Sequence, residues 1–268
     1  MIFEFVIFLT IGAAAGLLAG MFGVGGGALI VPALIFTLDH FNLGNHWTHH
    51  IAIASSLATI IGTSLSSSWI QNKNKNIEWS ILKKMVLGCI IGTIGGSYIA
   101  PYIPGIWLKW LFIIFLIYVG CKFIFKTNKV MQNQKSKVNS LGDSIFIAVG
   151  TLIGTFAALV GVGGGVLVVP FLKKCGIDMR KAIGTSAAFT LPVALGGTIG
   201  YIIAGWNIQE LPEYSLGFIY LPAVFSIMLT SMPMAKVGVQ IAQKLPVNKL
   251  ITYFGIFLLL LAVKLIVS

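Results

Sequence analysis

The residues of this chain best suited to chemistry are two copies of Gly-Val-Gly-Gly-Gly, at 23–27 and 161–165. Consecutive glycines are unfavourable inside a helix, because each costs about 1 kcal/mol relative to alanine. A helix is therefore expected to break at each motif and to leave backbone N–H groups without helical partners. Such N–H groups at the start of a helix form a binding site for anions. The candidate substrate-binding glycines are Gly23, Gly25, Gly26, Gly27, Gly161, Gly163, Gly164 and Gly165.

Neither motif matches a known nucleotide-binding pattern. The Lys-Ser/Thr pair that ends a phosphate-binding P-loop is absent, and no strand pattern precedes either motif, as a dinucleotide site requires. The sequence also offers no nucleophile beside a general base. We therefore expect neither an enzyme nor a bound cofactor.

Hydroxyl side chains follow each motif at a similar distance. Ser55 and Ser56 correspond to Thr185 and Ser186, and both pairs are candidates to donate hydrogen bonds to an oxyanion. The alternative is that they bond only to carbonyl groups of their own helix, as Ser and Thr often do in membranes. Arg180 is the sole arginine, and its planar guanidinium suits oxyanions. An interfacial anchor is the alternative role for Arg180.

Metal binding is a weaker interpretation of the polar residues. His40, His46, His49 and His50 fall in one short stretch, which leaves a divalent-metal permease as an alternative function. Their spacing fits no standard ligand pattern, so a polar outer loop is the preferred interpretation and no metal site is expected. Apart from Glu4, the carboxylates lie in loops or flanks, so a buried acidic relay of the kind used by cation transporters is not indicated.

Composition places most of the chain in a lipid bilayer. Of its 268 residues, 57% are hydrophobic and 9% are charged, and the mean hydropathy is +0.96. A soluble domain is about half apolar and about a quarter charged. A disordered chain, a typical soluble enzyme and a nucleic-acid-binding domain are thereby excluded. The net charge of +11 comes from lysines between apolar runs, where cytoplasmic loops of membrane proteins carry them.

The chain is built from two repeats. Residues 12–32 align with 150–170 without gaps, and eleven of the 21 positions are identical. Residues 50–58 align in the same way with 180–188. The apolar runs predict an all-α polytopic protein in which each repeat is a broken, re-entrant helical hairpin plus three transmembrane helices. The predicted units are repeat 1 at 1–125, a basic cytoplasmic linker at 126–143 and repeat 2 at 144–268.

The distribution of charge sets the predicted orientation. Lysine-rich segments at 71–84, 122–143 and 236–249 are expected inside, and the acidic segment at 205–215 outside. All four segments fall on their expected sides of the membrane only if each glycine motif is the tip of a re-entrant hairpin. This arrangement makes the repeats inverted and places both termini outside. Residues 2–22 are also long enough to span the membrane fully, so both possibilities stay open for that segment. Inverted repeats with broken helices are a plan of secondary transporters, and a non-transporting scaffold is a further alternative.

The sequence resembles the TauE/SafE family of sulfite exporters and permeases. The resemblance rests on GLLAGMFGVGGGALIVPAL (16–34), GTFAALVGVGGGVLVVPFL (154–172) and KAIGTSAAF (181–189). It implies transport of a small sulfur-containing anion, such as sulfite, thiosulfate or an organosulfonate, across a bacterial inner membrane. The expected partners are that anion and the lipid bilayer, with a homodimer compatible and nucleic acid excluded.

Overall fold

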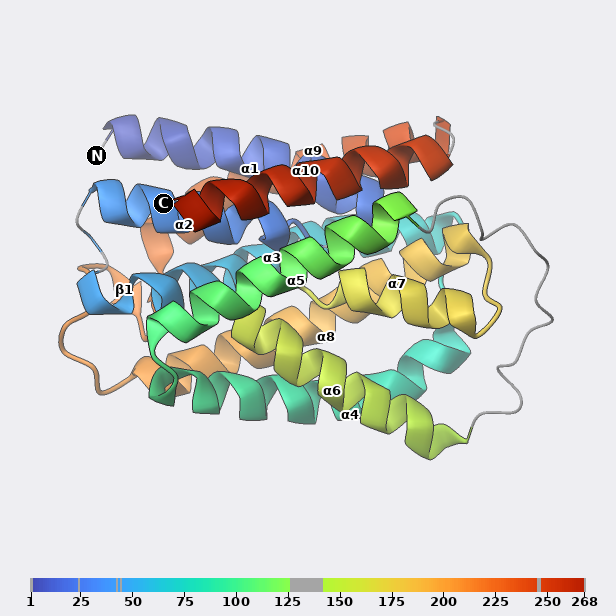
Figure 1. Ribbon diagram of the computed structural model, residues 1–268, viewed down its shortest axis with the longest axis horizontal. Coiled ribbons are helices and arrows are strands. Elements are labelled where there is room, and N and C mark those ends of the chain that lie inside the picture. The colour runs from blue at the N-terminus through green and yellow to red at the C-terminus, as the bar shows by residue number, and fades with distance from the viewer. Residues whose placement is uncertain are drawn as a thin grey trace.

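The protein is a bundle of helices with one very small sheet (Figure 1). The computed structural model describes residues 2–23, 25–41, 43, 45–125, 142–244 and 247–267. The first half contains α1 (Ile2–Phe22), α2 (Gly27–His40), α3 (Thr48–Lys73), α4 (Trp79–Ile99) and α5 (Gly105–Phe125). The second half contains α6 (Asp143–Val160), α7 (Gly165–Lys174), α8 (Met179–Gly205), α9 (Leu221–Lys244) and α10 (Val247–Val267). Most of the predicted linker, 126–141, lies outside the described residues.

Short elements connect the helices at their ends. The 3-10 turns η1 (Asn45–Trp47) and η2 (Ala100–Tyr102) precede α3 and α5. The strands β1 (Ser215–Leu216) and β2 (Ile219–Tyr220) form an antiparallel pair in which Ser215 lies opposite Tyr220. This hairpin leads directly into α9.

Seven of the described helices are long and apolar enough to cross a membrane. They are α1, α3, α4, α5, α6, α8 and α9, and α3 and α8 are the most buried of them. The helix α7 has 10 residues, which at 1.5 Å per residue is about 15 Å, or half the thickness of the hydrocarbon core. The sequence-based prediction of a polytopic helical membrane protein is confirmed.

The two hairpins enter the molecule from opposite ends. In Figure 1, α1 begins and α2 ends at the left, whereas α6 begins and α7 ends at the right. Both chain ends lie at the left of the same view. The helix contacts match this arrangement, because α1 packs against α9 while its counterpart α6 packs against α4. The central pair α3 and α8, and the outer pair α5 and α10, also pack together.

Small residues allow the closest of these contacts. Gly12 and Gly16 lie against the backbone of Ile227 and Ser231 in α9, and an added Cβ at either glycine would overlap it. Gly88 and Gly92 of α4 meet the backbone of α6 in the same way. The helices therefore approach through their backbones, as small-xxx-small spacing predicts for membrane helices.

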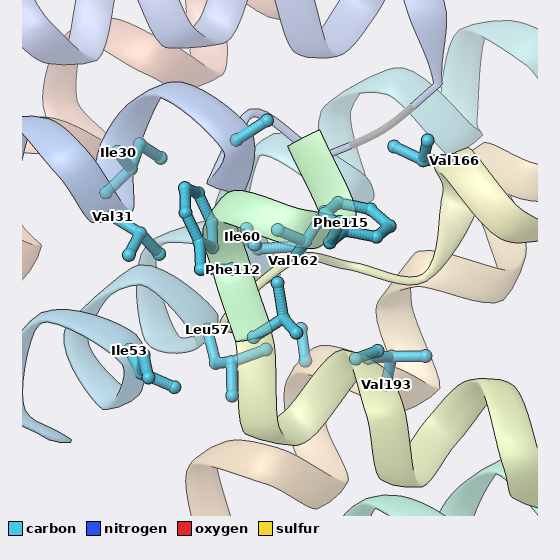
Figure 2. Packing of buried hydrophobic residues seen from close by; sticks show 14 of the residues in the cluster. Ile30, Val31, Ile53, Leu57, Ile60, Phe112, Phe115, Val162, Val166 and Val193 are labelled. Atoms are coloured by element: carbon cyan, nitrogen blue, oxygen red, sulfur yellow. The ribbon is translucent and has the colours of Figure 1, made fainter. Parts of the chain in front are cut away.

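The core joins both halves of the chain. Figure 2 shows Ile53 and Ile60 of α3 in one cluster with Val162, Val166 and Val193 of the second half. These side chains are almost completely buried. The described glycines of both motifs are buried within this core, which contains residues of both halves.

Candidate functional site

Each glycine motif ends one helix with a left-handed residue. Gly23 ends α1 with φ +68°, and its N–H donates to the carbonyl of Ala19 at 2.9 Å. Gly161 ends α6 with φ +73°, and its N–H donates to the carbonyl of Ala157 at 2.9 Å. A positive φ disfavours residues with a Cβ, so glycine is needed at both positions. The predicted breaks therefore occur at the same place in both repeats.

A second left-handed glycine starts the short helix that follows. Gly26 and Gly164 are the N-caps of α2 and α7, with φ +83° and +71°. The first helical hydrogen bonds run from Leu29 to the Gly26 carbonyl and from Leu167 to the Gly164 carbonyl. The preceding amides at the helix starts have no intrahelical acceptor, and the helix dipole makes this end partially positive. The predicted starts of the two short helices are thus present, and anion binding at them stays a prediction.

The two glycine turns are in direct contact with each other. An added Cβ on Gly27 would overlap the carbonyl oxygen of Gly161. An added Cβ on Gly165 would overlap the carbonyl oxygen of Gly23 in the same way. The glycines of both motifs are buried. The fold therefore brings these predicted site residues together, in a state where the turns themselves occupy the centre.

Two of the predicted hydroxyl groups form hydrogen bonds with the glycine turn of the opposite half. Ser56 Oγ donates to the carbonyl of Gly161 at 2.9 Å, and Ser186 Oγ lies 3.3 Å from the carbonyl oxygen of Gly23. Ser186 also bonds within its own helix, to the Ile183 carbonyl at 2.8 Å. Both serines are fully buried. Their contacts cross between repeats, which the proposed back-bonding to their own helices does not explain by itself.

The other two predicted hydroxyl groups, those of Ser55 and Thr185, bond instead to backbone N–H groups just before α9 and α4. Ser55 Oγ accepts a hydrogen bond from the N–H of Tyr220 at 2.9 Å, just before α9. Thr185 Oγ1 accepts one from the N–H of Glu78 at 2.9 Å, just before α4. The two bonds correspond to each other under exchange of the halves. Neither Ser55 nor Thr185 bonds to a glycine turn.

Arg180 lies apart from the glycine turns. It is in the first turn of α8, and its side chain is exposed. Its backbone N–H donates to the carboxylate of Asp178, which caps the helix, at 3.0 Å. In this state the arginine occupies an end of the molecule rather than its buried centre.

An ion pair lies next to Arg180, at the start of α8. Lys181 Nζ lies 2.6 Å from Glu78 Oε1, and both side chains are partly exposed. Because exposed ion pairs contribute little, we expect the melting temperature of Lys181→Gln to stay close to that of wild type. The melting temperature of the purified variant in low and high salt measures this. A larger loss that persists in high salt would contradict the assignment of a weak surface pair.

Sequence reasoning missed Thr63 as a contact of the first turn. Thr63 Oγ1 donates to the carbonyl of Gly25 at 3.0 Å and is fully buried. It lies seven residues after Ser56, which is two helical turns along the same face of α3. That spacing is the signal that could have identified it.

The histidine stretch does not form a metal cluster within the part of the chain that the structure describes. His50 is buried, and its Nε2 lies 3.1 Å from the carbonyl oxygens of both Ala100 and Ile103. Its ring stacks on Phe218 and meets Trp47 edge-on. His50 is therefore a packing residue between η2 and the β-hairpin, which corrects its interpretation as part of a polar loop.

Removal of the Ser56 hydroxyl tests how much its hydrogen bond to Gly161, in the other repeat, stabilises the protein. The variant Ser56→Ala leaves the Gly161 carbonyl without this buried donor, which is expected to cost about 1–3 kcal/mol. At 2–4 °C per kcal/mol, the melting temperature should fall by roughly 2–12 °C. Thr10→Ala is the matched control, because Thr10 is exposed and bonds within its own helix. An equal shift in the two variants would show that the bond across the repeats adds nothing.

Comparison with known proteins agrees with this architecture. The family model described as "Sulfite exporter TauE/SafE" matches residues 8–265. The chain belongs to the TauE/SafE family. A probable membrane transporter protein of Haemophilus influenzae is 35% identical over 264 residues, which cover 98% of both chains. One from Methanocaldococcus jannaschii is 26% identical over 96% of this chain and 98% of its own. No solved structure matches this chain.

Membership of the TauE/SafE family, with these relatives, identifies the chain as a multi-pass membrane transporter. The match spans both glycine motifs and both sets of helices. A third relative, the probable membrane transporter protein YunE of Bacillus subtilis, is 28% identical over 75% of this chain and 80% of its own. The residues matched by the family model therefore include all of the site residues described above.

Proposed function

We propose that this TauE/SafE protein is a secondary transporter of small sulfur-containing oxyanions, such as sulfite, thiosulfate or an organosulfonate. The anion binds between the glycine turns at 23–27 and 161–165, where amides and hydroxyl groups are available as donors. Its cell location is the bacterial inner membrane, with the lysine-rich end inside and both termini outside. The two halves act as inverted repeats that rock against each other.

The observation that carries this proposal is the chemistry of the buried polar groups. Among the described residues, those that are buried and polar are serines, threonines, Gln71 and His50. Neither an aspartate nor a glutamate is among them. A cation moving through the centre would need carboxylates to offset its desolvation, whereas an anion is stabilised by N–H and O–H donors. This inventory supports an anion as the substrate.

The contact between the turns supports an alternating mechanism. Because the turns touch, an anion can bind only after the halves have separated at one end. In this mechanism, the bond of Thr185 with Glu78 before α4 closes one end, and the bond of Ser55 with Tyr220 before α9 closes the other. Opening one of these ends while the other stays closed exposes the centre to one side at a time. Transport then occurs when the protein alternates between a state with the first bond broken and a state with the second bond broken.

Reconstitution into liposomes tests the proposal. The purified protein is expected to move radiolabelled sulfite or thiosulfate in a saturable manner, and the other sulfur oxyanions are expected to compete. Protein-free liposomes give the background. Absence of flux and of competition, from protein that remains folded, would overturn the sulfur-anion assignment. Flux of a divalent metal alone would favour the histidine stretch as the site.

A further inference from the structure

Thr190 of α8 lies where the two glycine turns meet. Its side chain is fully buried. An added Cβ on Gly25 of the first turn would lie 2.7 Å from Thr190 Cγ2. An added Cβ on Gly165 of the second turn would lie 3.2 Å from Thr190 Oγ1, and one on Gly163 would overlap the Thr190 methyl group. This threonine therefore touches the turns of both repeats.

The hydroxyl of Thr190 has a different hydrogen-bond acceptor from the other hydroxyl groups at the turns. Ser56, Thr63 and Ser186 each direct a hydroxyl to a glycine carbonyl of a turn. Thr190 Oγ1 donates instead to the carbonyl of Ser186, four residues earlier in its own helix, at 2.9 Å. Threonine in a helix has two accessible χ1 rotamers. Thr190 can thus exchange its helix bond for one to a ligand, while Ser56, Thr63 and Ser186 keep their bonds to the turns.

The corresponding position in the first repeat carries no hydroxyl. The alignment of 50–58 with 180–188, extended by two residues, pairs Thr190 with Ile60. An added Cβ on Gly25 would lie 2.8 Å from Ile60 Cγ2, and one on Gly27 would lie 2.9 Å from Ile60 Cδ1. Ile60 therefore approaches Gly25 from α3 as Thr190 approaches it from α8. At this pair of corresponding positions, α8 has a hydroxyl and α3 has an alkyl group.

We propose that Thr190 is the specificity-determining residue of the anion site. When the turns separate, its hydroxyl donates a hydrogen bond to an oxygen of the substrate, and Ile60 contacts the part that carries no oxygen. The site then favours an anion with an oxygen-rich end and an apolar or soft end, such as methanesulfonate or thiosulfate, over the symmetric sulfate ion. Ser56, Thr63 and Ser186 already bond to the turns, so the Thr190 hydroxyl is the added donor, and the Ile60 side chain cannot pair with a substrate oxygen on its side. This inference rests on the function proposed above.

Binding measurements on matched variants test the role of Thr190. Calorimetry of the purified protein with methanesulfonate, thiosulfate and sulfate gives three dissociation constants for each variant. Thr190→Val keeps the shape and removes the hydroxyl, and should raise the dissociation constant for methanesulfonate about 10- to 100-fold. Thr190→Ser keeps the hydroxyl and should stay close to wild type. Ile60→Thr adds a second hydroxyl and should improve sulfate binding relative to methanesulfonate.

The control variant removes an equivalent hydroxyl that is not among the nearest neighbours of the motif glycines. Thr93 of α4 is also fully buried and donates to the carbonyl four residues earlier, Cys89, at 2.9 Å. Thr93→Val should therefore lose the same helix bond without changing any dissociation constant. It separates the loss of a ligand contact from a general effect on the helix.

The outcomes distinguish this inference from the proposed function. If the wild type binds none of the three anions, nor sulfite, the proposed function fails. If the wild type binds and Thr190→Val binds equally well, the role of Thr190 is wrong while the transporter assignment stands. If Thr190→Val does not fold, the ratio of sulfate to methanesulfonate binding in Ile60→Thr decides, and an unchanged ratio overturns the proposal.

Discussion

Replacing Gly165 by alanine is expected to abolish transport and to destabilise the protein by about 1–3 kcal/mol. The new Cβ would overlap the carbonyl oxygen of Gly23, which belongs to the other repeat. Backbone atoms cannot rotate away as a flexible side chain can, so the two turns must move apart. Because the substrate is proposed to bind between these turns, their separation should also spoil the site. Flux into liposomes and the melting temperature measure the two effects.

Gly95→Ala is the matched control for this change. Gly95 lies inside α4, and an added Cβ there meets nothing within 4 Å. Alanine is a better helix former than glycine by about 0.5–1 kcal/mol, so this variant should be as stable as wild type or slightly more stable. Normal flux in Gly165→Ala would show that contact between the turns is not required for transport.

Replacing Gly92 by valine is expected to prevent stable folding in the membrane. Gly92 is in the face of α4 that packs against α6, and an added Cβ would overlap the carbonyl oxygen of Thr151. In lipid, association of helices depends on close packing, since lipid is as apolar as the side chains. The overlap of the valine side chain with α6 should cost about 1–3 kcal/mol for each added group that cannot be accommodated. The yield of monodisperse protein after detergent extraction and its melting temperature measure the loss.

The same helix supplies the comparison for Gly92. Gly95→Val places an equal side chain three residues away, at a position with open space around it. Valine is slightly unfavourable in helices, but this effect is below about 1 kcal/mol. The yield of Gly95→Val should therefore remain close to wild type. Similar losses in both variants would mean that valine in α4, and not the contact with α6, causes the defect.

The sequence was most informative about local structure. Both helix breaks fall at the glycine motifs because the turns need left-handed residues, and Gly23 and Gly161 supply them. Gly12 and Gly16 are four residues apart, the spacing of small-xxx-small packing, and α9 covers this face. These features depend on neighbouring residues in the chain, so pattern and spacing were sufficient to locate them. The orientation of the repeats relative to the membrane and the identity of the anion stay predictions.

The sequence was less informative about which side chains meet at the site. Ser55 and Ser56 are adjacent, and both were predicted to bind substrate, yet one bonds to Tyr220 and the other to Gly161. Adjacent residues on a helix point about 100° apart, so they reach different neighbours. Arg180 was grouped with them by type, but the start of α8 holds it at an exposed end.

The amino-acid sequence by itself determined that this is a polytopic helical membrane protein, with two glycine-broken hairpins and donors suited to an anion. Composition and helical period decide such properties, because they depend on solvent and on near neighbours. Only the tertiary structure decided that Ser56 fastens Gly161 and that Thr190 touches both turns. Those contacts join residues from different repeats, and they exist because α3 and α8 pack against each other at the centre of the bundle. Packing between distant segments, rather than any local pattern, sets the partners of Ser55, Ser56 and Thr185.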